Sequence, residues 1–249
     1  MNLFEFLIKP MPLHISRIRA ICFDVDGTLS DTDDVMAEKL ARLLNPFHFL
    51  FPKQETARLA RRILMATEAP GNFLLGIPDL LGLDSVIFAL ADWLARNPRK
   101  KPRKFLMMPG VKEMLAELSK RYPLAVVSVR DTRTTKVFLE QFDLLQYFKC
   151  IATAQTCKHT KPFPDQILWA AEKMEVSPEA CLMVGDTTVD MRAGSAAGAQ
   201  KVGVLCGFGE RDELQKVGAD MILTTPAELV QVLQGPAKLF EPTECCINI

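Results

Sequence analysis

Two pairs of aspartates have the residue type and spacing to bind a metal ion. Asp24 and Asp26 stand two residues apart in the segment Asp-Val-Asp-Gly-Thr, and Asp186 and Asp190 stand four residues apart in Asp-Thr-Thr-Val-Asp. Residues two apart in an extended segment point the same way, so Asp24 and Asp26 can face one site. Carboxylate oxygens suit a hard cation such as Mg²⁺, and four carboxylates brought together would repel one another without a neutralising cation.

Each pair also has a purely structural interpretation. The first motif is compatible with an exposed Asp-Gly turn, and Asp190 is compatible with a carboxylate that favours the start of a helix. A calcium-binding loop is excluded, because glycine stands at the fourth position of the motif and Val35 occupies the place of the bidentate glutamate.

Ser128 and Lys161 are two further candidates for the same site. Ser128 lies near the end of an apolar run and offers a hydroxyl donor, while Lys161 in Lys-Pro-Phe-Pro offers a fixed positive charge before a predicted helix. Taken alone, a serine at a strand end or a lysine in a loop is usually structural or solvated. Their order relative to the acidic pairs is what makes them candidates.

The elements that must position these residues follow from the pattern of apolar residues. Short apolar runs alternate with amphipathic segments, which predicts a Rossmann-like parallel sheet sandwiched by helices, in the α/β class. The predicted strands are 20–23, 124–129, 150–154, 181–184, 201–205 and 220–223. The predicted helices are 111–118, 132–142, 164–175, 188–197 and 226–233. Ligands of such sheets gather beyond the carboxyl ends of the strands, so we expect the acids to meet there.

The stretch between the first strand and Pro109 has a different pattern. Helical periodicity marks segments near 36–44, 56–67 and 85–96, and no strand is apparent between them. We therefore expect residues 31–105 to form an inserted all-helical domain, and residues 1–30 with 106–249 to form the α/β core.

Composition excludes several broad functions. The 249 residues carry 30 basic and 30 acidic side chains, so the net charge of zero argues against a general nucleic-acid binder. No apolar run reaches the length of a membrane span, and the N-terminal segment has no signal-peptide pattern, so we expect a cytoplasmic protein. Seven cysteines, an odd number, are too few for a disulfide scaffold. Cys22, Cys181 and Cys206 lie within apolar runs and are expected to be buried free thiols. The sequence does not predict the oligomeric state.

Four motifs, in this order along the chain, resemble those of the haloacid dehalogenase-like hydrolase superfamily. They are the Asp24 motif, Ser128 after an apolar strand, Lys161 in Lys-Pro-x-Pro, and the motif from Asp186 to Asp190. The similarity is closest over 183–210, where the sequence resembles phosphoglycolate phosphatase-type members. The resemblance implies that the helical insertion is a cap domain that closes over the site.

The resemblance also implies roles for the site residues. Asp24 would be the nucleophile that attacks phosphorus, and Asp26 would act as general acid and then general base. Ser128 and Lys161 would bind the transferring phosphoryl group. The implied cofactor is Mg²⁺, held by Asp24, the Asp26 carbonyl and Asp186, with Asp190 either as a further ligand or as a support for the other ligands. The implied activity is Mg²⁺-dependent hydrolysis of a small phosphorylated metabolite through an aspartyl-phosphate.

Two alternatives remain open at this stage. A phosphosugar mutase of the β-phosphoglucomutase type would share the nucleophile and the acid, although Thr28 argues against it. A non-catalytic regulatory or binding module could also use the same scaffold. Asp26 itself argues against the branch that cleaves carbon-halogen bonds, which needs no acid for its leaving group. The residues after Ser128, Val129-Arg130-Asp131, depart from the usual pattern, so the substrate is not predicted.

Overall fold

A six-stranded parallel sheet forms the centre of the molecule. The structure is a computed structural model that describes residues 13–31 and 105–234. Its strands are β1 (Ala20–Phe23), β2 (Leu124–Val127), β3 (Phe148–Ala152), β4 (Cys181–Gly185), β5 (Gln200–Val204) and β6 (Met221–Leu223). Their spatial order is β3-β2-β1-β4-β5-β6, with every neighbouring pair parallel. This order changes direction beside β1, and the carboxyl ends of β1 and β4 lie next to each other there.

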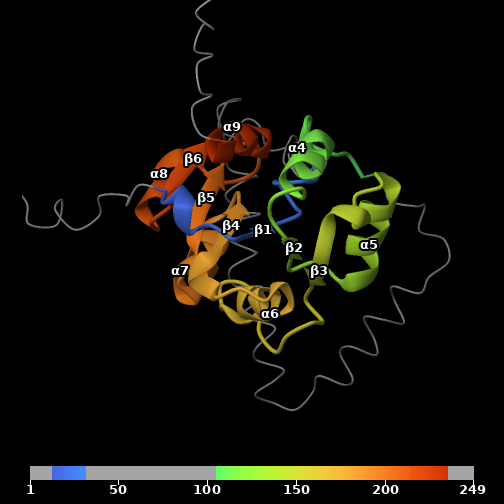
Figure 1. The fold of residues 1–249 in the computed structure, drawn as a ribbon, viewed down its shortest axis with the longest axis horizontal. Coiled ribbons are helices and arrows are strands. Elements are labelled where there is room, and N and C mark those ends of the chain that lie inside the picture. Colours follow the sequence, from blue (N-terminus) through green and yellow to red (C-terminus); the bar gives the residue numbers. More distant parts are fainter. Residues whose placement is uncertain (1–12, 32–104, 235–249) are drawn as a thin grey trace, which may run out of the picture.

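Helices cover both faces of the sheet (Figure 1). They are α4 (Val111–Leu118), α5 (Thr132–Gln141), α6 (Asp165–Met174), α7 (Thr188–Ala197), α8 (Arg211–Lys216) and α9 (Leu229–Gln234). Short 3-10 turns join them: η2 (Ile15–Arg17), η4 (Leu145–Tyr147), η5 (Pro178–Ala180) and η6 (Pro226–Glu228). The predicted Rossmann-like α/β fold is confirmed. Within the part of the chain that the structure describes, no helix combines the length and apolarity needed to span a bilayer.

The two faces of the sheet bury side chains of different size. Successive residues of a strand point to opposite faces. On one face, large side chains such as Ile21 and Phe23 pack into the main core with α4, α5 and α9. On the other, small side chains such as Ala20 and Cys22 pack against α6 and α7. The small residues on that second face allow α6 and α7 to pack close to the strands that carry the candidate site.

Several boundaries differ from those predicted. Strand β3 begins at Phe148, two residues early, because it lies at the edge of the sheet and its first residues are only partly buried, which weakens the apolar signal. Helix α8 was not predicted, since its six residues bury only Leu214 and show no helical periodicity. The helix predicted over 226–233 is instead the 3-10 turn η6 followed by α9.

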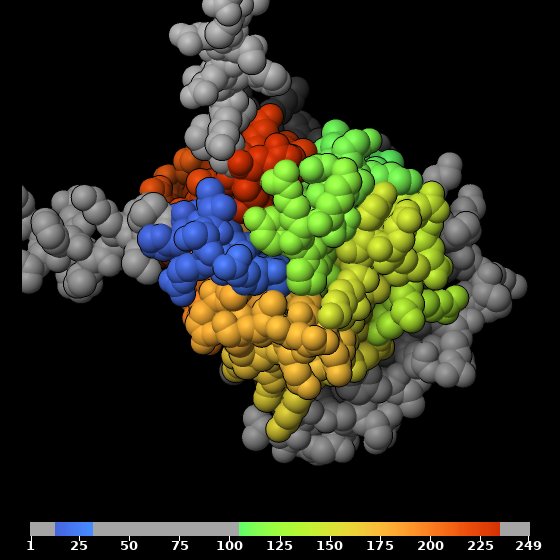
Figure 2. All heavy atoms as spheres, in the orientation of Figure 1, coloured from blue at the N-terminus to red at the C-terminus, as the bar shows by residue number. Residues whose placement is uncertain are grey.

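The two described segments that flank residues 32–104 lie side by side. The Met108 amide donates to the Leu29 carbonyl at 3.0 Å, and the Asp31 amide donates to the Leu106 carbonyl at 2.9 Å. In Figure 2 the 13–31 segment, in blue, lies against the green segment that follows residue 105. Apart from its two end residues, the predicted helical domain of residues 31–105 lies outside the described residues, and this domain division stays a prediction.

Candidate active site

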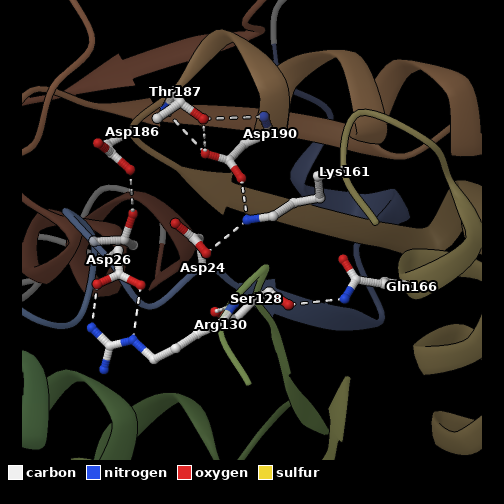
Figure 3. A network of polar contacts seen from close by, with 10 residues as sticks. Asp24, Asp26, Ser128, Arg130, Lys161, Gln166, Asp186, Thr187 and Asp190 are labelled. Carbon is white, nitrogen blue, oxygen red and sulfur yellow. Dashed lines mark hydrogen bonds and ion pairs between the residues drawn. The ribbon is translucent and has the colours of Figure 1, made fainter. Parts of the chain in front are cut away.

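Three buried carboxylates meet at the carboxyl edge of β1 and β4 (Figure 3). Asp24 directly follows β1, Asp186 directly follows β4, and Asp190 lies in the first turn of α7. One oxygen of each carboxylate lies within 4.8 Å of the others. The Asp24 amide also donates to the Val184 carbonyl at 2.9 Å, which ties the first motif to the strand before the second. The sheet thus brings together residues that lie more than 160 positions apart.

Lys161 bridges two of these carboxylates. It lies in the loop between β3 and α6, and its Nζ donates to Asp24 Oδ1 at 2.7 Å and to Asp190 Oδ1 at 2.5 Å. Burial of the ammonium works against its charge, but the two carboxylates outweigh that effect and hold the pKa of Lys161 above its usual value. The Lys161 ammonium therefore neutralises part of the negative charge of a cluster that holds three carboxylates.

The pKa of Asp24 is strongly perturbed. Burial, together with the neighbouring carboxylates of Asp190 and Asp26, outweighs the opposing effect of Lys161 and raises the pKa of Asp24 from 3.8 to about 8. Such a shift is typical of functional sites, where a charged group is held in surroundings that disfavour its charge. It also means that any cation that enters the cluster competes with a proton on Asp24.

Local hydrogen bonds orient Asp186 and Asp190. Thr187 caps α7, and Asp190 Oδ2 accepts from the Thr187 amide at 3.0 Å and from the Thr187 hydroxyl at 2.7 Å. Asp186 Oδ2 accepts from the Phe208 amide at 2.8 Å, while the Thr28 hydroxyl donates to Asp186 Oδ1 at 3.4 Å. Each carboxylate thus has a fixed direction before any ligand binds.

Two glycines leave room for these carboxylates. A Cβ at Gly207 would overlap the Asp186 carboxylate, and a Cβ at Gly185 would overlap the Asp190 side chain. Neither glycine has a positive φ, so close approach is the reason for a residue without a side chain at these two positions. The loop after β5 therefore forms part of the site.

Ser128 lies one residue beyond β2 and is completely buried. Its Oγ accepts from the Arg130 amide at 3.1 Å, and its carbonyl accepts from Gln166 Nε2 at 2.9 Å. Because Gln166 is in the first turn of α6, this bond joins the Ser128 loop to the helix that follows Lys161. The Gln166 carboxamide oxygen is buried and has no hydrogen-bond partner in the described chain.

The side chain of Asp26 is not in the carboxylate cluster. Figure 3 shows it directed away from Lys161 and toward Arg130. Arg130 Nε donates to Asp26 Oδ2 at 3.0 Å, and Nη2 of the same guanidinium donates to Asp26 Oδ1. Gly27, with a φ of 74°, turns the chain directly after it. The metal ligand expected from this residue is its main-chain carbonyl, so this orientation does not decide that assignment.

Comparison with known proteins assigns the family. The model of the haloacid dehalogenase-like hydrolases matches residues 21–204, which is most of the chain. The chain belongs to this family of hydrolases. The matched region runs from β1 to β5 and so includes all six residues predicted for the site.

Similar proteins span nearly the whole length of this hydrolase. It is 27% identical over 216 residues to a pyrophosphatase from Anoxybacillus flavithermus, covering 87% of this chain and 97% of that protein. It is 29% identical over 223 residues to a phosphorylated carbohydrates phosphatase from Thermotoga maritima, covering 87% and 99%. A solved hydrolase structure from Pseudomonas syringae is 27% identical, with a TM-score of 0.64, covering 87% of this chain and 98% of the other.

The residues of this hydrolase fit a hard divalent cation. Among the described residues, the cluster offers three carboxylates and no softer ligand, and Mg²⁺ prefers such oxygen donors, whereas zinc and copper favour nitrogen or sulfur. The carboxylates exceed the one lysine ammonium in number, and the raised pKa of Asp24 reflects that excess. Asp24, Asp186 and Asp190 can therefore hold such an ion by their side chains.

Sequence reasoning missed two residues of this hydrolase's site. In the sequence, Arg130 stands out only as part of a departure from the usual family pattern after Ser128, and no motif in the sequence marks Gln166 as a site residue. The signal for Arg130 was its position two residues after a strand-end serine, at the same edge of the sheet. For Gln166 the signal was a polar residue in the first turn of a helix that follows a candidate lysine.

Proposed function

We propose that this hydrolase is a Mg²⁺-dependent phosphatase that cleaves a small phosphate monoester through an aspartyl-phosphate on Asp24. The observation that carries the proposal is the hydrogen bonding of the two Asp24 carboxylate oxygens. Lys161 binds its Oδ1, whereas its Oδ2 makes no hydrogen bond within the described residues. A carboxylate fixed through one oxygen presents the other as a nucleophile.

The first step forms a bond between an Asp24 oxygen and phosphorus. The bond from phosphorus to the ester oxygen breaks, and Asp26 gives that oxygen its proton as general acid. In the second step water attacks phosphorus, Asp26 takes the proton, and the electron pair of the breaking bond returns to the Asp24 carboxylate. The products are an alcohol and inorganic phosphate.

Lys161 and Ser128 bind the transferring group in this proposal. The Lys161 ammonium is already held beside Asp24, where it stabilises negative charge that develops on the phosphoryl oxygens. Ser128 Oγ uses one lone pair to accept the Arg130 amide, and its hydroxyl proton is then directed to a substrate oxygen. Burial of both side chains excludes water from these contacts.

Asp24, Asp186 and Asp190, with the Asp26 carbonyl, would hold Mg²⁺. When bound, the ion neutralises the cluster and lets an anionic nucleophile approach an anionic phosphoryl group. Without it, repulsion and the proton on Asp24 both oppose the first step.

The relatives support this class of reaction. The two similar curated proteins are a pyrophosphatase and a phosphatase of phosphorylated carbohydrates. This chain is accordingly a phosphoric monoester hydrolase whose substrate is a small phosphorylated compound.

The test is release of inorganic phosphate from a panel of small phosphate esters, with and without Mg²⁺. Wild type is expected to need the ion, and Asp24→Asn, which keeps the shape but removes the nucleophile, is expected to be inactive. Asp212→Asn, an exposed change in α8, is the matched control and should retain full activity. Full activity of Asp24→Asn would overturn the covalent route, and isomerised sugar phosphate without phosphate release would replace the hydrolase by the mutase.

A further inference from the structure

The Asp26 carboxylate is held by a two-point contact. Both of its oxygens accept from the Arg130 guanidinium, one from Nε at 3.0 Å and the other from Nη2 (Figure 3). The Asp26 side chain is 28% exposed, whereas that of Arg130 is only 9% exposed. A planar fork that meets both carboxylate oxygens fixes the plane of the carboxylate as well as its position.

Arg130 is in turn held by four other residues of the core. Its guanidinium lies over the Phe105 ring, 4.9 Å from the centroid, and 5.9 Å from that of Phe138 in α5. Its amide donates to Ser128 Oγ at 3.1 Å, and its carbonyl accepts from the Ala154 amide at 3.1 Å. The fork is therefore a rigid support for the Asp26 carboxylate.

We propose that Arg130 is the residue that positions Asp26 for the hydrolysis of the aspartyl-phosphate. The inference rests on the proposed function, in which Asp26 takes a proton from the attacking water. The two-point contact fixes the plane and the direction of the Asp26 carboxylate, and a general base for this second step needs such a fixed geometry.

If Arg130 has this role, its loss affects the two chemical steps differently. An ester with a good leaving group, such as p-nitrophenyl phosphate, needs no proton from Asp26 in the first step. Loss of Arg130 should then leave formation of the aspartyl-phosphate intact and slow its hydrolysis. A purely structural role for the ion pair would slow both steps, because Asp24, Ser128 and Arg130 share one edge of the sheet.

The experiment uses the full chain with Mg²⁺ and p-nitrophenyl phosphate, in steady-state and stopped-flow assays. For Arg130→Met we expect kcat to fall roughly 10- to 100-fold, part of the about 10²- to 10⁴-fold contribution of general base catalysis. KM should fall in parallel, so that kcat/KM changes less than about threefold. A burst of about one p-nitrophenolate per site should appear, because the phosphorylated enzyme accumulates.

Three further variants make the result specific. Arg130→Lys keeps the charge and most of the packing but loses the fork, so it should show the same signature with a smaller fall in kcat. Arg133→Met makes the same change at an exposed position of α5 and should match wild type. In the Asp26→Asn background, Arg130→Met should lower kcat no further, since a residue that acts through another has no effect once that other is removed.

The outcomes distinguish this inference from the proposed function. The role of Arg130 would be overturned if kcat and kcat/KM fell equally, without a burst, in both Arg130 variants. It would also be overturned if both variants kept the wild-type kcat and kcat/KM. A further tenfold loss of kcat on adding Arg130→Met to Asp26→Asn would overturn it as well. If Arg130→Met does not melt cooperatively, the Arg130→Lys pattern decides by the same criteria. A wild type that releases no p-nitrophenolate with Mg²⁺ would instead overturn the proposed function, and the inference with it.

Discussion

Binding of Mg²⁺ should weaken as the pH falls below 8, because a proton on Asp24 competes with the ion. Burial and the neighbouring carboxylates raise the pKa of Asp24 to about 8. The ion needs the carboxylate, so acidification favours the protonated, metal-free form and alkaline pH favours binding. With that pKa, about half of the Asp24 carboxyls are protonated at pH 8 and about 99% at pH 6, so the apparent Kd should rise about fiftyfold between them.

Isothermal titration calorimetry of the EDTA-treated full chain measures this directly. Titrations between pH 6 and 9, in buffers with different ionisation enthalpies, give both the Kd and the number of protons released. We expect release of about one proton per Mg²⁺ at pH 6 to 7, falling toward zero at pH 9. Asp24→Asn should bind more weakly but with a nearly constant Kd. A wild-type Kd that changes less than about threefold between pH 8 and 6, with no proton release, would refute this reasoning.

Three further changes probe the supports of the site. Gly207→Ala places a Cβ against the Asp186 carboxylate, so its Mg²⁺ affinity in calorimetry should fall roughly 10- to 100-fold. Lys161→Met removes the ammonium between two buried carboxylates. At pH 9 with EDTA, urea denaturation should show a loss of roughly 3–5 kcal/mol in its free energy of unfolding, part of which Mg²⁺ restores. Asp131→Ala removes the N-cap of α5, whose side chain accepts from the Thr134 amide, and should cost about 1 kcal/mol in urea denaturation.

Each of these changes has a matched control. Gly218→Ala, at a glycine with nothing within 4 Å, should destabilise the fold without changing the Mg²⁺ affinity, and equal losses of affinity in both glycine variants would contradict the steric argument. Lys112→Met breaks an exposed pair with Asp143 and should cost at most about 1 kcal/mol. Asp131→Asn retains an N-cap acceptor, so a loss as large as that of the alanine variant would argue against capping.

The convergence of the acids could be predicted because it depends on topology alone. Asp24 and Asp186 each follow an apolar strand directly, and parallel strands end at one edge of a sheet. Any sequence with that alternation of strands and helices must bring such residues to the same side. The position of Lys161 beside them could not be derived in this way, because it lies in a loop whose path no periodicity describes.

The pairing of Asp26 with Arg130 depends on side-chain rotation, which the sequence does not encode locally. Residues two apart in an extended segment point the same way, which predicted that Asp26 faces the site as Asp24 does. The chain turns at Gly27, and the Asp26 carboxylate lies outside the cluster of three carboxylates and pairs with Arg130. A guanidinium 104 positions away in sequence, held on two aromatic rings, decides that direction.

The central claim is that Asp24 becomes phosphorylated in the course of turnover. It can be tested by acid quench of the full chain during turnover with Mg²⁺, followed by borohydride reduction, which converts an aspartyl-phosphate to homoserine, and peptide mass spectrometry. We expect homoserine at position 24 in wild type, more of it in Arg130→Met, and none when Mg²⁺ is omitted. Homoserine at another aspartate, or none at position 24 in a sample that is releasing phosphate, would contradict the account.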